Sequence, residues 1–141
     1  EVIRIPLLLR YPCKYPTPLS SDAMVITSDI ATTIASLAGI SMPPGREGMP
    51  LDAVLADPTT SRQHVLIESS GGWFTYPNRA IRNDRWKLIA SRKHSGTGPF
   101  HFELYDMDAD RFELTNLYAE PSYQSTALEL REALDNALPL D

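Results

Sequence analysis

The chain has 141 residues, of which 43% are hydrophobic and 22% are charged, and its formal net charge is -5. This composition is typical of a globular protein of one or two small domains. The net negative charge argues against a nucleic-acid-binding protein, because binding to phosphates needs a concentrated basic surface. No apolar run approaches the about 18 residues that a membrane-spanning helix needs. We therefore expect neither nucleic acid nor membrane as a partner.

The first part of the chain predicts a buried strand followed by a helix. The apolar run Leu7 to Leu9 is typical of a strand that is buried on both faces, as in a parallel sheet. Ser28 is the expected N-cap of a helix, Ile30 and Ile34 follow helical spacing, and Gly39 is the expected left-handed C-terminal residue.

A proline-rich loop and a helical turn over Leu51 to Leu55 come next. Asp57-Pro58 ends this turn and opens a polar connection to Arg62. We place the domain boundary there, with residues 1–61 in one part and residues 62–141 in the other.

The second part predicts a small antiparallel sheet. Asn83-Asp84 lies between two runs rich in branched and aromatic residues, which is typical of a β-hairpin. Further strands are expected at His64 to Ser69 and at His101 to Tyr105. After Pro121, apolar residues at helical spacing predict a C-terminal helix that covers one face. The predicted fold class is α+β, with a four-stranded antiparallel sheet covered by that helix.

The residues alone assemble no catalytic or metal site. Asp106, Asp108 and Asp110 alternate as in a calcium loop, but the sixth and twelfth positions of an EF-hand would be Arg111 and Leu117, which do not fit. An acidic turn is the better interpretation. The three histidines follow no metal-binding spacing, and no serine lies in a nucleophile motif. The sequence has a single cysteine, so an internal disulfide is excluded.

Aromatic residues in a glycine-flanked segment form the one candidate binding surface. Trp73 and Phe74 follow Gly71-Gly72, and aromatic side chains in such loops either line a binding surface or pack against the side of a sheet. The sequence leaves both interpretations open.

The order of motifs resembles the C-terminal portion of sulfatases, in the alkaline-phosphatase-like superfamily. Each motif is weak alone, but their joint order and spacing are specific. The matching segments are Arg4-Ile-Pro6, Ser28-Asp29-Ile-Ala with Ile34 to Ile40, Gly48-Met-Pro-Leu51, Arg79-Ala-Ile-Arg82 with Arg85-Trp-Lys87, and Glu103-Leu-Tyr-Asp106 with Asp110, Glu113 and Asn116-Leu117. Thr32 departs from the family's usual proline and Cys13 from its usual loop glycine.

The resemblance implies an α/β sulfatase core that ends within residues 1–61, followed by the small sheet. It also implies hydrolysis of a sulfate ester by a formylglycine, with a calcium ion that neutralises the sulfate oxygens. Cys13 does not match the formylglycine motif Cys/Ser-x-Pro-x-Arg, because its proline, Pro16, falls one place late. We therefore expect no catalytic residue, metal or cofactor in this chain, and a missing N-terminal sulfatase domain as its partner.

From their positions in loops we expect Trp73, Phe74 and His94 at the lip of the substrate pocket. The separated chain should be inactive and should self-associate, because a strand without neighbours leaves apolar faces exposed. Two alternatives stay open. One is a fragment of a related phosphonate or phosphodiester hydrolase, and the other is a free-standing interaction module.

Overall fold

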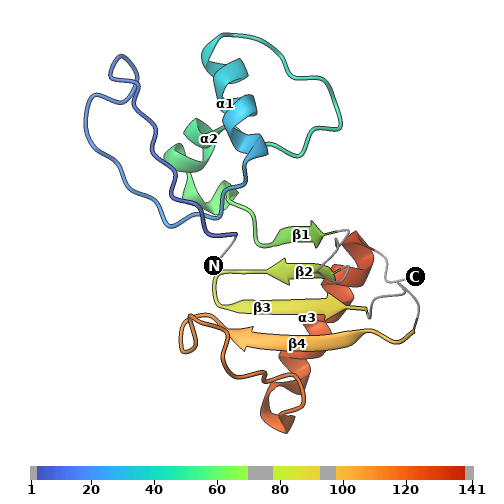
Figure 1. Cartoon of the computed structure of the whole chain (residues 1–141). Coiled ribbons are helices and arrows are strands. Elements are labelled where there is room, and N and C mark those ends of the chain that lie inside the picture. The colour runs from blue at the N-terminus through green and yellow to red at the C-terminus, as the bar shows by residue number, and fades with distance from the viewer. Residues whose placement is uncertain (1–2, 70–77, 93–97, 139–141) are drawn as a thin grey trace. The chain divides into compact units, whose positions relative to one another are not determined.

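The structure is a computed structural model that describes residues 3–69, 78–92 and 98–138. The chain divides into two compact units, Glu1–Ser61 and Arg62–Asp141. Figure 1 shows the helices of the first unit and the sheet with its helix in the second. In the described part of the chain, no helix has both the length and the apolar character needed to cross a membrane.

The first unit contains α1 (Ser28–Leu37), α2 (Leu51–Ala56) and the 3-10 turn η1 (Pro58–Thr60). The predicted end of α1 is confirmed. Gly39 has a φ of +69°, the Gly39 amide donates to the Ser36 carbonyl at 3.1 Å, and the Ile40 amide donates to the Ala35 carbonyl at 2.9 Å. This pair of bonds is the Schellman motif, which satisfies carbonyls that the last turn leaves free.

The expected cap of α1 is wrong in its residue. Thr27 is the N-cap and makes no side-chain capping bond. Instead, the carboxylate of Asp29, one residue inside the helix, accepts from the Ile26 amide at 2.8 Å and from the Met49 amide at 2.7 Å. These two bonds link the segment before the helix to the loop before α2. The carboxylate that accepts them is fully buried.

Thr33 and Gly48 complete this connection. The Leu51 amide donates to the Thr33 hydroxyl at 2.9 Å, and that hydroxyl donates to the Asp29 carbonyl at 2.6 Å. A Cβ on Gly48 would collide with the Thr32 hydroxyl and with the Ser28 carbonyl. Glycine is therefore needed for the loop to pass so close to the first turn of α1.

The apolar stripe of α1 points outward. Ile34 is 61% exposed and Ile30 39% exposed, whereas the polar residues Asp29 and Thr33 are buried. The hydrophobic spacing predicted the helix correctly, but the face that packs within the unit is the polar one.

The predicted strand at Leu7 to Leu9 is not formed. Residues 4–10 carry no regular structure, and Leu8 is 94% exposed. A strand is stabilised by hydrogen bonds to its neighbours. The described residues of the first unit contain no other strand that could pair with it.

The second unit confirms the predicted sheet. Its strands β1 (Val65–Ser69), β2 (Asn78–Arg82), β3 (Trp86–Ser91) and β4 (His101–Asp106) pair antiparallel in sequence order. The tight turn between β2 and β3 is held by the Asn83 side chain, which accepts from the Trp86 amide at 2.6 Å and from the Arg85 amide at 3.1 Å. The residue predicted to form this turn therefore stabilises it directly.

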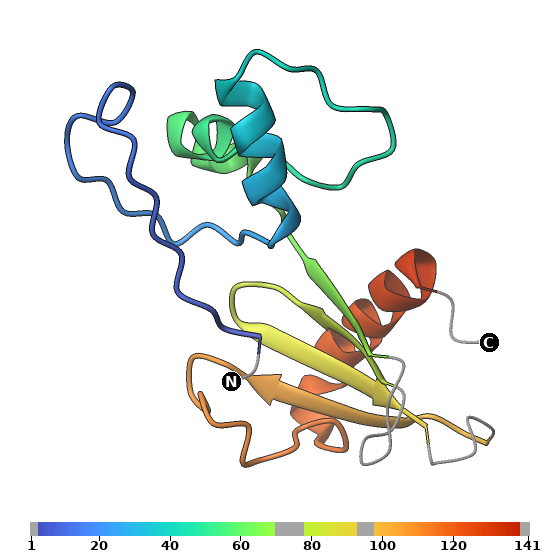
Figure 2. The ribbon, with the colours of Figure 1, turned by 45° about the horizontal axis from the view of Figure 1, so that its top comes forward.

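The final helix covers one face of the sheet, as expected. A short 3-10 turn, η2 (Pro121–Tyr123), leads into α3 (Gln124–Ala137). Figure 2 shows α3 lying across one side of the strands. Side chains from α3 and the strands bury one another, and the buried apolar core consists of Ile81, Leu88, Ala90, Leu104, Ala127, Leu130 and Leu134.

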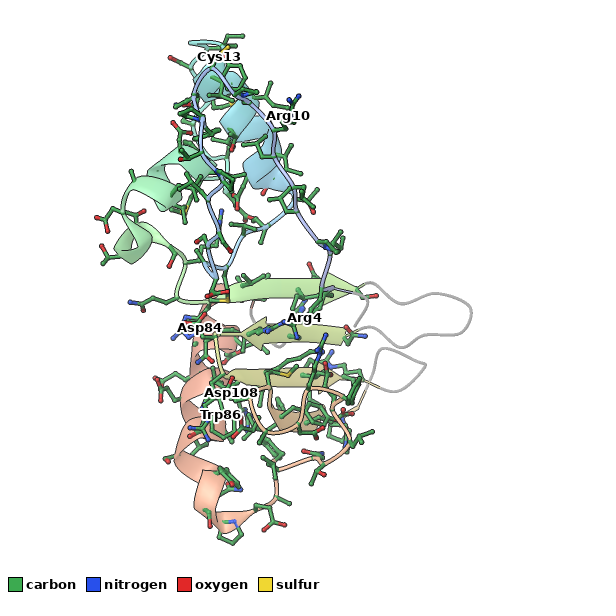
Figure 3. All side chains as sticks on the ribbon, turned by 90° about the vertical axis from the view of Figure 1, so that its left-hand side faces the viewer. Arg4, Arg10, Cys13, Asp84, Trp86 and Asp108 are labelled. Carbon is green, nitrogen blue, oxygen red and sulfur yellow. The ribbon has the colours of Figure 1, made fainter. Side chains whose placement is uncertain are left out.

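An ion pair closes the end of the sheet where β3 begins and β4 ends. Arg85 Nη2 donates to Asp106 Oδ2 at 2.7 Å, and Arg85 Nε donates to the same oxygen at 3.1 Å. Figure 3 labels Asp84, Trp86 and Asp108 at this end of the sheet. Hydrogen bonds from Arg85, and weaker ones from the Ala109 and Asp108 amides, hold the pKa of Asp106 below its usual range.

We expect Asp29→Asn to loosen the first unit. An asparagine side chain has only one acceptor oxygen, so one of the two amides would face an NH2 group, at a cost of about 1–3 kcal/mol. Hydrogen exchange at the Ile26 and Met49 amides should therefore accelerate. Asp22→Asn, at an exposed position, is the matched control. Unchanged exchange in Asp29→Asn would contradict the role given to this carboxylate.

We expect Asp106→Asn to lower the stability of the second unit in a pH-dependent way. The pKa of Asp106 is lower in the folded than in the unfolded chain, so its ionised form adds stability above about pH 4, and this contribution is lost as the pH falls through the folded pKa. The urea midpoints of wild type and variant, followed by tryptophan fluorescence, should differ at pH 7, and the difference should shrink as the pH falls below about 4. Asp84→Asn, exposed in the neighbouring turn, should show no such convergence.

Candidate functional site

The strand register assigns every strand residue of the sheet to one of two faces. Residues opposite one another in an antiparallel pair lie on the same face, and successive residues alternate between faces. One face packs against α3. We call the opposite one the second face, and it consists of Val65, Ile67, Ser69, Asn78, Ala80, Arg82, Lys87, Ile89, Ser91, His101, Glu103 and Tyr105.

One end of the second face is a continuous polar row across all four strands. Ser69 pairs with Asn78, Asn78 with Ser91, and Ser91 with His101. We call these four residues the end row. They lie where β1 and β3 end and where β2 and β4 begin, at the opposite end of the sheet from the Asn83 turn. Since neighbouring strands are about 4.8 Å apart, the row presents four hydrogen-bonding side chains at regular intervals.

His101 is held by a line of side chains along β4. Its Nε2 lies 3.7 Å from Glu103 Oε1, and the Tyr105 hydroxyl donates to Glu103 Oε2 at 2.6 Å. Burial and the bond to Glu103 raise the pKa of Tyr105 well above its usual value, so its phenol stays protonated and remains a donor. The His101 side chain, which is 71% exposed, therefore lies next to the Glu103 carboxylate, and the buried Tyr105 hydroxyl orients that carboxylate.

The other end of the second face holds a nearly buried ion pair. Lys87 Nζ donates to both oxygens of Glu113, at 2.6 and 2.8 Å, and the two side chains are 11% and 19% exposed. Arg82 lies opposite Lys87 in the register. Two cations side by side repel each other, so the Glu113 carboxylate is needed to offset the charge of Lys87.

Glu113 reaches Lys87 from an unusual backbone conformation. Its φ is +58°, and among the described residues it alone combines a side chain beyond glycine with a positive φ. Such a conformation is strained for a residue with a Cβ and persists only where neighbouring contacts stabilise it. Here the Asp110 carboxylate accepts from the Leu114 and Thr115 amides, both at 2.8 Å, immediately beyond Glu113. These backbone bonds lower the pKa of Asp110.

Asn116 fastens the end of this loop to the edge strand. Its side-chain oxygen accepts from the Leu104 amide at 3.0 Å and from the Tyr118 amide at 2.9 Å, and its NH2 group donates to the Phe102 carbonyl at 3.3 Å. Asp110, Glu113 and Asn116, the family-like residues after β4, thus fix the loop geometry. They are structural residues in this chain.

The acidic turn has the same structural role. Asp106 pairs with Arg85 and also accepts from the Asp108 amide at 3.2 Å, while Asp110 accepts from the loop beyond it. In the residues that the structure describes, no three His, Cys, Asp or Glu side chains gather in a way that could hold a metal ion. Cys13 is exposed in a turn, where Figure 3 labels it near Arg10.

The predicted pocket-lip residues lie outside the described residues. Trp73 and Phe74 fall in segment 70–77, and His94 falls in segment 93–97. The end row was missed from the sequence because serine and asparagine at strand ends are common turn residues. Only the register of all four strands shows that they align. A hairpin turn centred on Asn83-Asp84, as the sequence predicts, would have paired Asn78 with Ile89. The observed turn is centred one residue later, on Asp84-Arg85, and pairs Asn78 with Ser91.

Comparison with known proteins places the chain in a family. Residues 1–138 match the family N-sulphoglucosamine sulphohydrolase, C-terminal. The chain is 28% identical to an ulvan-active sulfatase of Formosa agariphila, over 98% of the chain and 27% of that protein. It is also 28% identical to an N-acetylglucosamine-6-O-sulfatase of Bacteroides thetaiotaomicron, over 96% of the chain and 25% of that protein. The chain thus spans about a quarter of these relatives.

Solved structures share the fold. A protein in complex with its substrate D-glucosamine-2-N,6-O-disulfate superimposes with a TM-score of 0.68 at 25% identity, over 77% of this chain and 23% of that one. A phosphonate monoester hydrolase of Agrobacterium radiobacter has a TM-score of 0.60 at 22% identity, over 77% of this chain and 23% of that one, which shows likeness of fold alone. With its match over residues 1–138, the chain belongs to the C-terminal family of N-sulphoglucosamine sulphohydrolases and is the C-terminal portion of a sulfatase.

Proposed function

We propose that the protein carrying this chain hydrolyses sulfate esters of saccharides, and that the chain completes the core and helps to frame the substrate pocket. The observation that carries the proposal is the family match over residues 1–138. The names of the relatives support the substrate class, since two of the compared proteins act on sulfated glucosamine derivatives and one is active on ulvan.

The cofactors expected for a sulfatase belong outside this chain. A formylglycine would supply the nucleophile and calcium would neutralise the sulfate oxygens. Among the residues that the structure describes, the candidates for these groups fit neither of them. Cys13 lacks the required neighbours, and Asp106 and Asp110 already hold Arg85 and backbone amides. We therefore assign the chain the roles of packing and pocket framing, with the chemistry performed by residues of the remaining protein.

The outward-facing apolar residues of the first unit support a packing role. Ile5, Leu8, Ile34 and Ile40 are between 61% and 94% exposed. Exposed apolar side chains in such numbers mark a surface that another part of a protein covers. We propose that residues 1–61 are the end of the α/β core and that the N-terminal sulfatase domain covers this surface.

Activity of the protein carrying this chain tests the proposed reaction. We expect it to release sulfate from 4-nitrophenyl sulfate and from N-acetylglucosamine 6-sulfate, and to act at least about tenfold more slowly on a phenyl phosphonate, a difference of about 1.4 kcal/mol in activation free energy. Separately produced Glu1–Asp141 should be inactive. Faster phosphonate cleavage would favour the alternative hydrolase, and an active isolated chain would contradict the division of roles.

A reading frame beyond this chain tests the interaction-module alternative. A continuous upstream frame that encodes Cys/Ser-x-Pro-x-Arg would exclude a free-standing module, whereas a natural start codon at or near Glu1 would favour it.

We expect isolated Glu1–Asp141 to self-associate through its first unit. Burial of the exposed apolar side chains between copies would replace the missing covering domain. Sedimentation velocity at increasing concentration should show a rising average mass. The double variant Ile34→Ser, Ile40→Ser should shift this curve to higher concentration, and Leu128→Ser, on the exposed side of α3, is the control. A strictly monomeric wild type would contradict this expectation.

Trp73, Phe74 and His94 remain our proposed pocket-lip residues. In the active protein, changing each to alanine should alter kcat/KM for a saccharide sulfate, since loop residues commonly supply binding contacts. Phe112→Ala, an exposed aromatic residue in a different loop, is the matched control. If the three variants keep the wild-type preference among substrates, the assignment is wrong.

A further inference from the structure

We propose that Arg82 forms an ion pair with a carboxylate of the N-terminal sulfatase domain, at the end of the second face that adjoins the Asn83 turn. The inference rests on the proposed function, which supplies the N-terminal domain, and adds to it a residue of the small sheet that this domain binds. Its basis is a guanidinium group without a partner among the described residues, beside a second positive charge.

Arg82 is the last residue of β2 and lies on the second face, between Val65 of β1 and Lys87 of β3. Its side chain is half-buried and its Nε is fully buried. Within the described part of the chain, however, the guanidinium makes no hydrogen bond and no ion pair. A buried charged donor without an acceptor is destabilising, because it has lost its bonds to water. Segments 70–77 and 93–97 connect strands at the opposite end of the sheet, so the strand neighbours of Arg82 are all described.

The other two arginines of this hairpin have carboxylate partners. Arg79 Nε donates to Glu68 Oε1 at 3.1 Å, and Arg85 donates through Nε and Nη2 to Asp106 Oδ2. The sheet thus pairs its arginines with carboxylates wherever the chain itself supplies one. Arg82 is the exception among these three.

The charge balance of its row points to the same missing group. The row contains Arg82 and Lys87, and the carboxylate that reaches it is that of Glu113. Both oxygens of Glu113 accept from Lys87, at 2.6 and 2.8 Å, so this carboxylate serves the lysine. Two positive charges therefore share one negative charge, and one further carboxylate would balance them.

A protein carboxylate suits this position chemically. The planar guanidinium directs Nε and Nη donors to one side, and a carboxylate accepts from both. The neighbour of Arg82 on β1, Val65, is apolar and half-buried. An ion pair formed beside apolar surface is screened less by water and is correspondingly stronger.

Two facts favour the N-terminal domain over a second copy of the chain. The chain spans 27% and 25% of two relatives, so in the proposed protein the remaining part is tethered to it. Tethering gives two parts of one polypeptide an effective concentration of about the mM range. Two copies of the chain, in contrast, each carry a net charge of -5, which opposes their approach.

Zero-length crosslinking of the full-length protein tests the proposal. In Arg82→Lys, a carbodiimide activates carboxylates, and the new amine at position 82 forms an amide with the carboxylate that it contacts, while the carbodiimide becomes its urea. Peptide mass spectrometry should join position 82 to an aspartate or glutamate outside residues 1–141.

Arg79→Lys, on the same strand, is the matched control, because its partner is known. It should join to Glu68. A crosslink from position 82 to a carboxylate within this chain, a crosslink between two copies, or no crosslink while the control reacts would each overturn the proposal.

Thermal unfolding of the full-length protein separates an ion pair from simple packing. Arg82→Met keeps an apolar side chain and removes the charge, and it should lower Tm by at least about 2 °C. Arg82→Glu should lower Tm further, and replacement of the crosslinked carboxylate by lysine in the same protein should restore most of the loss. Failure of this charge exchange to restore Tm would contradict the ion pair.

Sodium sulfate tests the alternative that Arg82 holds a free anion. At the ionic strength of a sodium chloride control, sulfate should change the Tm of wild type and Arg82→Met equally, because a carboxylate already occupies the guanidinium. A rise confined to the wild type would assign Arg82 to a small anion and overturn the proposal. None of these measurements uses turnover, so a protein that gives the crosslink but cleaves no sulfate ester would refute the proposed reaction alone.

Discussion

The register of the four strands under α3 is the constraint on which the second unit depends. Leu88 and Leu104 are opposite one another in the register and are fully buried, as is Leu134 of the helix. A shift of one residue would move every side chain of a strand to the opposite face and would bring polar residues into this core. Burial of the leucines therefore selects the register, and the same register aligns the end row on the other face.

The first unit is organised by polar rather than apolar contacts. The buried Asp29 carboxylate and the Thr33 hydroxyl satisfy backbone amides of two loops. Buried hydrogen-bonding groups of this kind define one arrangement of the chain, since each unmade bond carries a desolvation cost. They do not remove apolar surface from water. The isoleucines of α1 therefore remain exposed, and the hydrophobic spacing of this helix does not match the face that packs within the unit.

Local sequence signals predicted the parts of the fold whose causes are local. Asn83 forms its turn with nearby amides, Gly39 ends α1 with a positive φ, and the apolar stripe after Pro121 packs on the sheet. The strand expected at Leu7 to Leu9 would need hydrogen bonds to neighbouring strands. Its apolar composition could not show whether such strands are present in this chain. The cap expected from Ser28 was wrong because a carboxylate one residue later can reach two amides at once.

The candidate site was less predictable for the same reason. The end row exists only when three strand pairings are known together, and the line from His101 to Tyr105 depends on which face of β4 is turned away from the helix. The sequence identified family-like residues such as Asp110, Glu113 and Asn116. It could not separate structural from functional roles, because that distinction depends on which groups their side chains contact.

The left-handed conformation of Glu113 has a consequence for how this loop can vary among related chains. Glycine would suit the backbone best at this position, yet it would leave the ammonium group of Lys87 without its counter-charge beside Arg82. The positive φ thus favours glycine at position 113, whereas the charge of Lys87 favours glutamate there. Natural replacements of Glu113 should accordingly be accompanied by an uncharged residue at position 87, so that the two sites evolve as a pair.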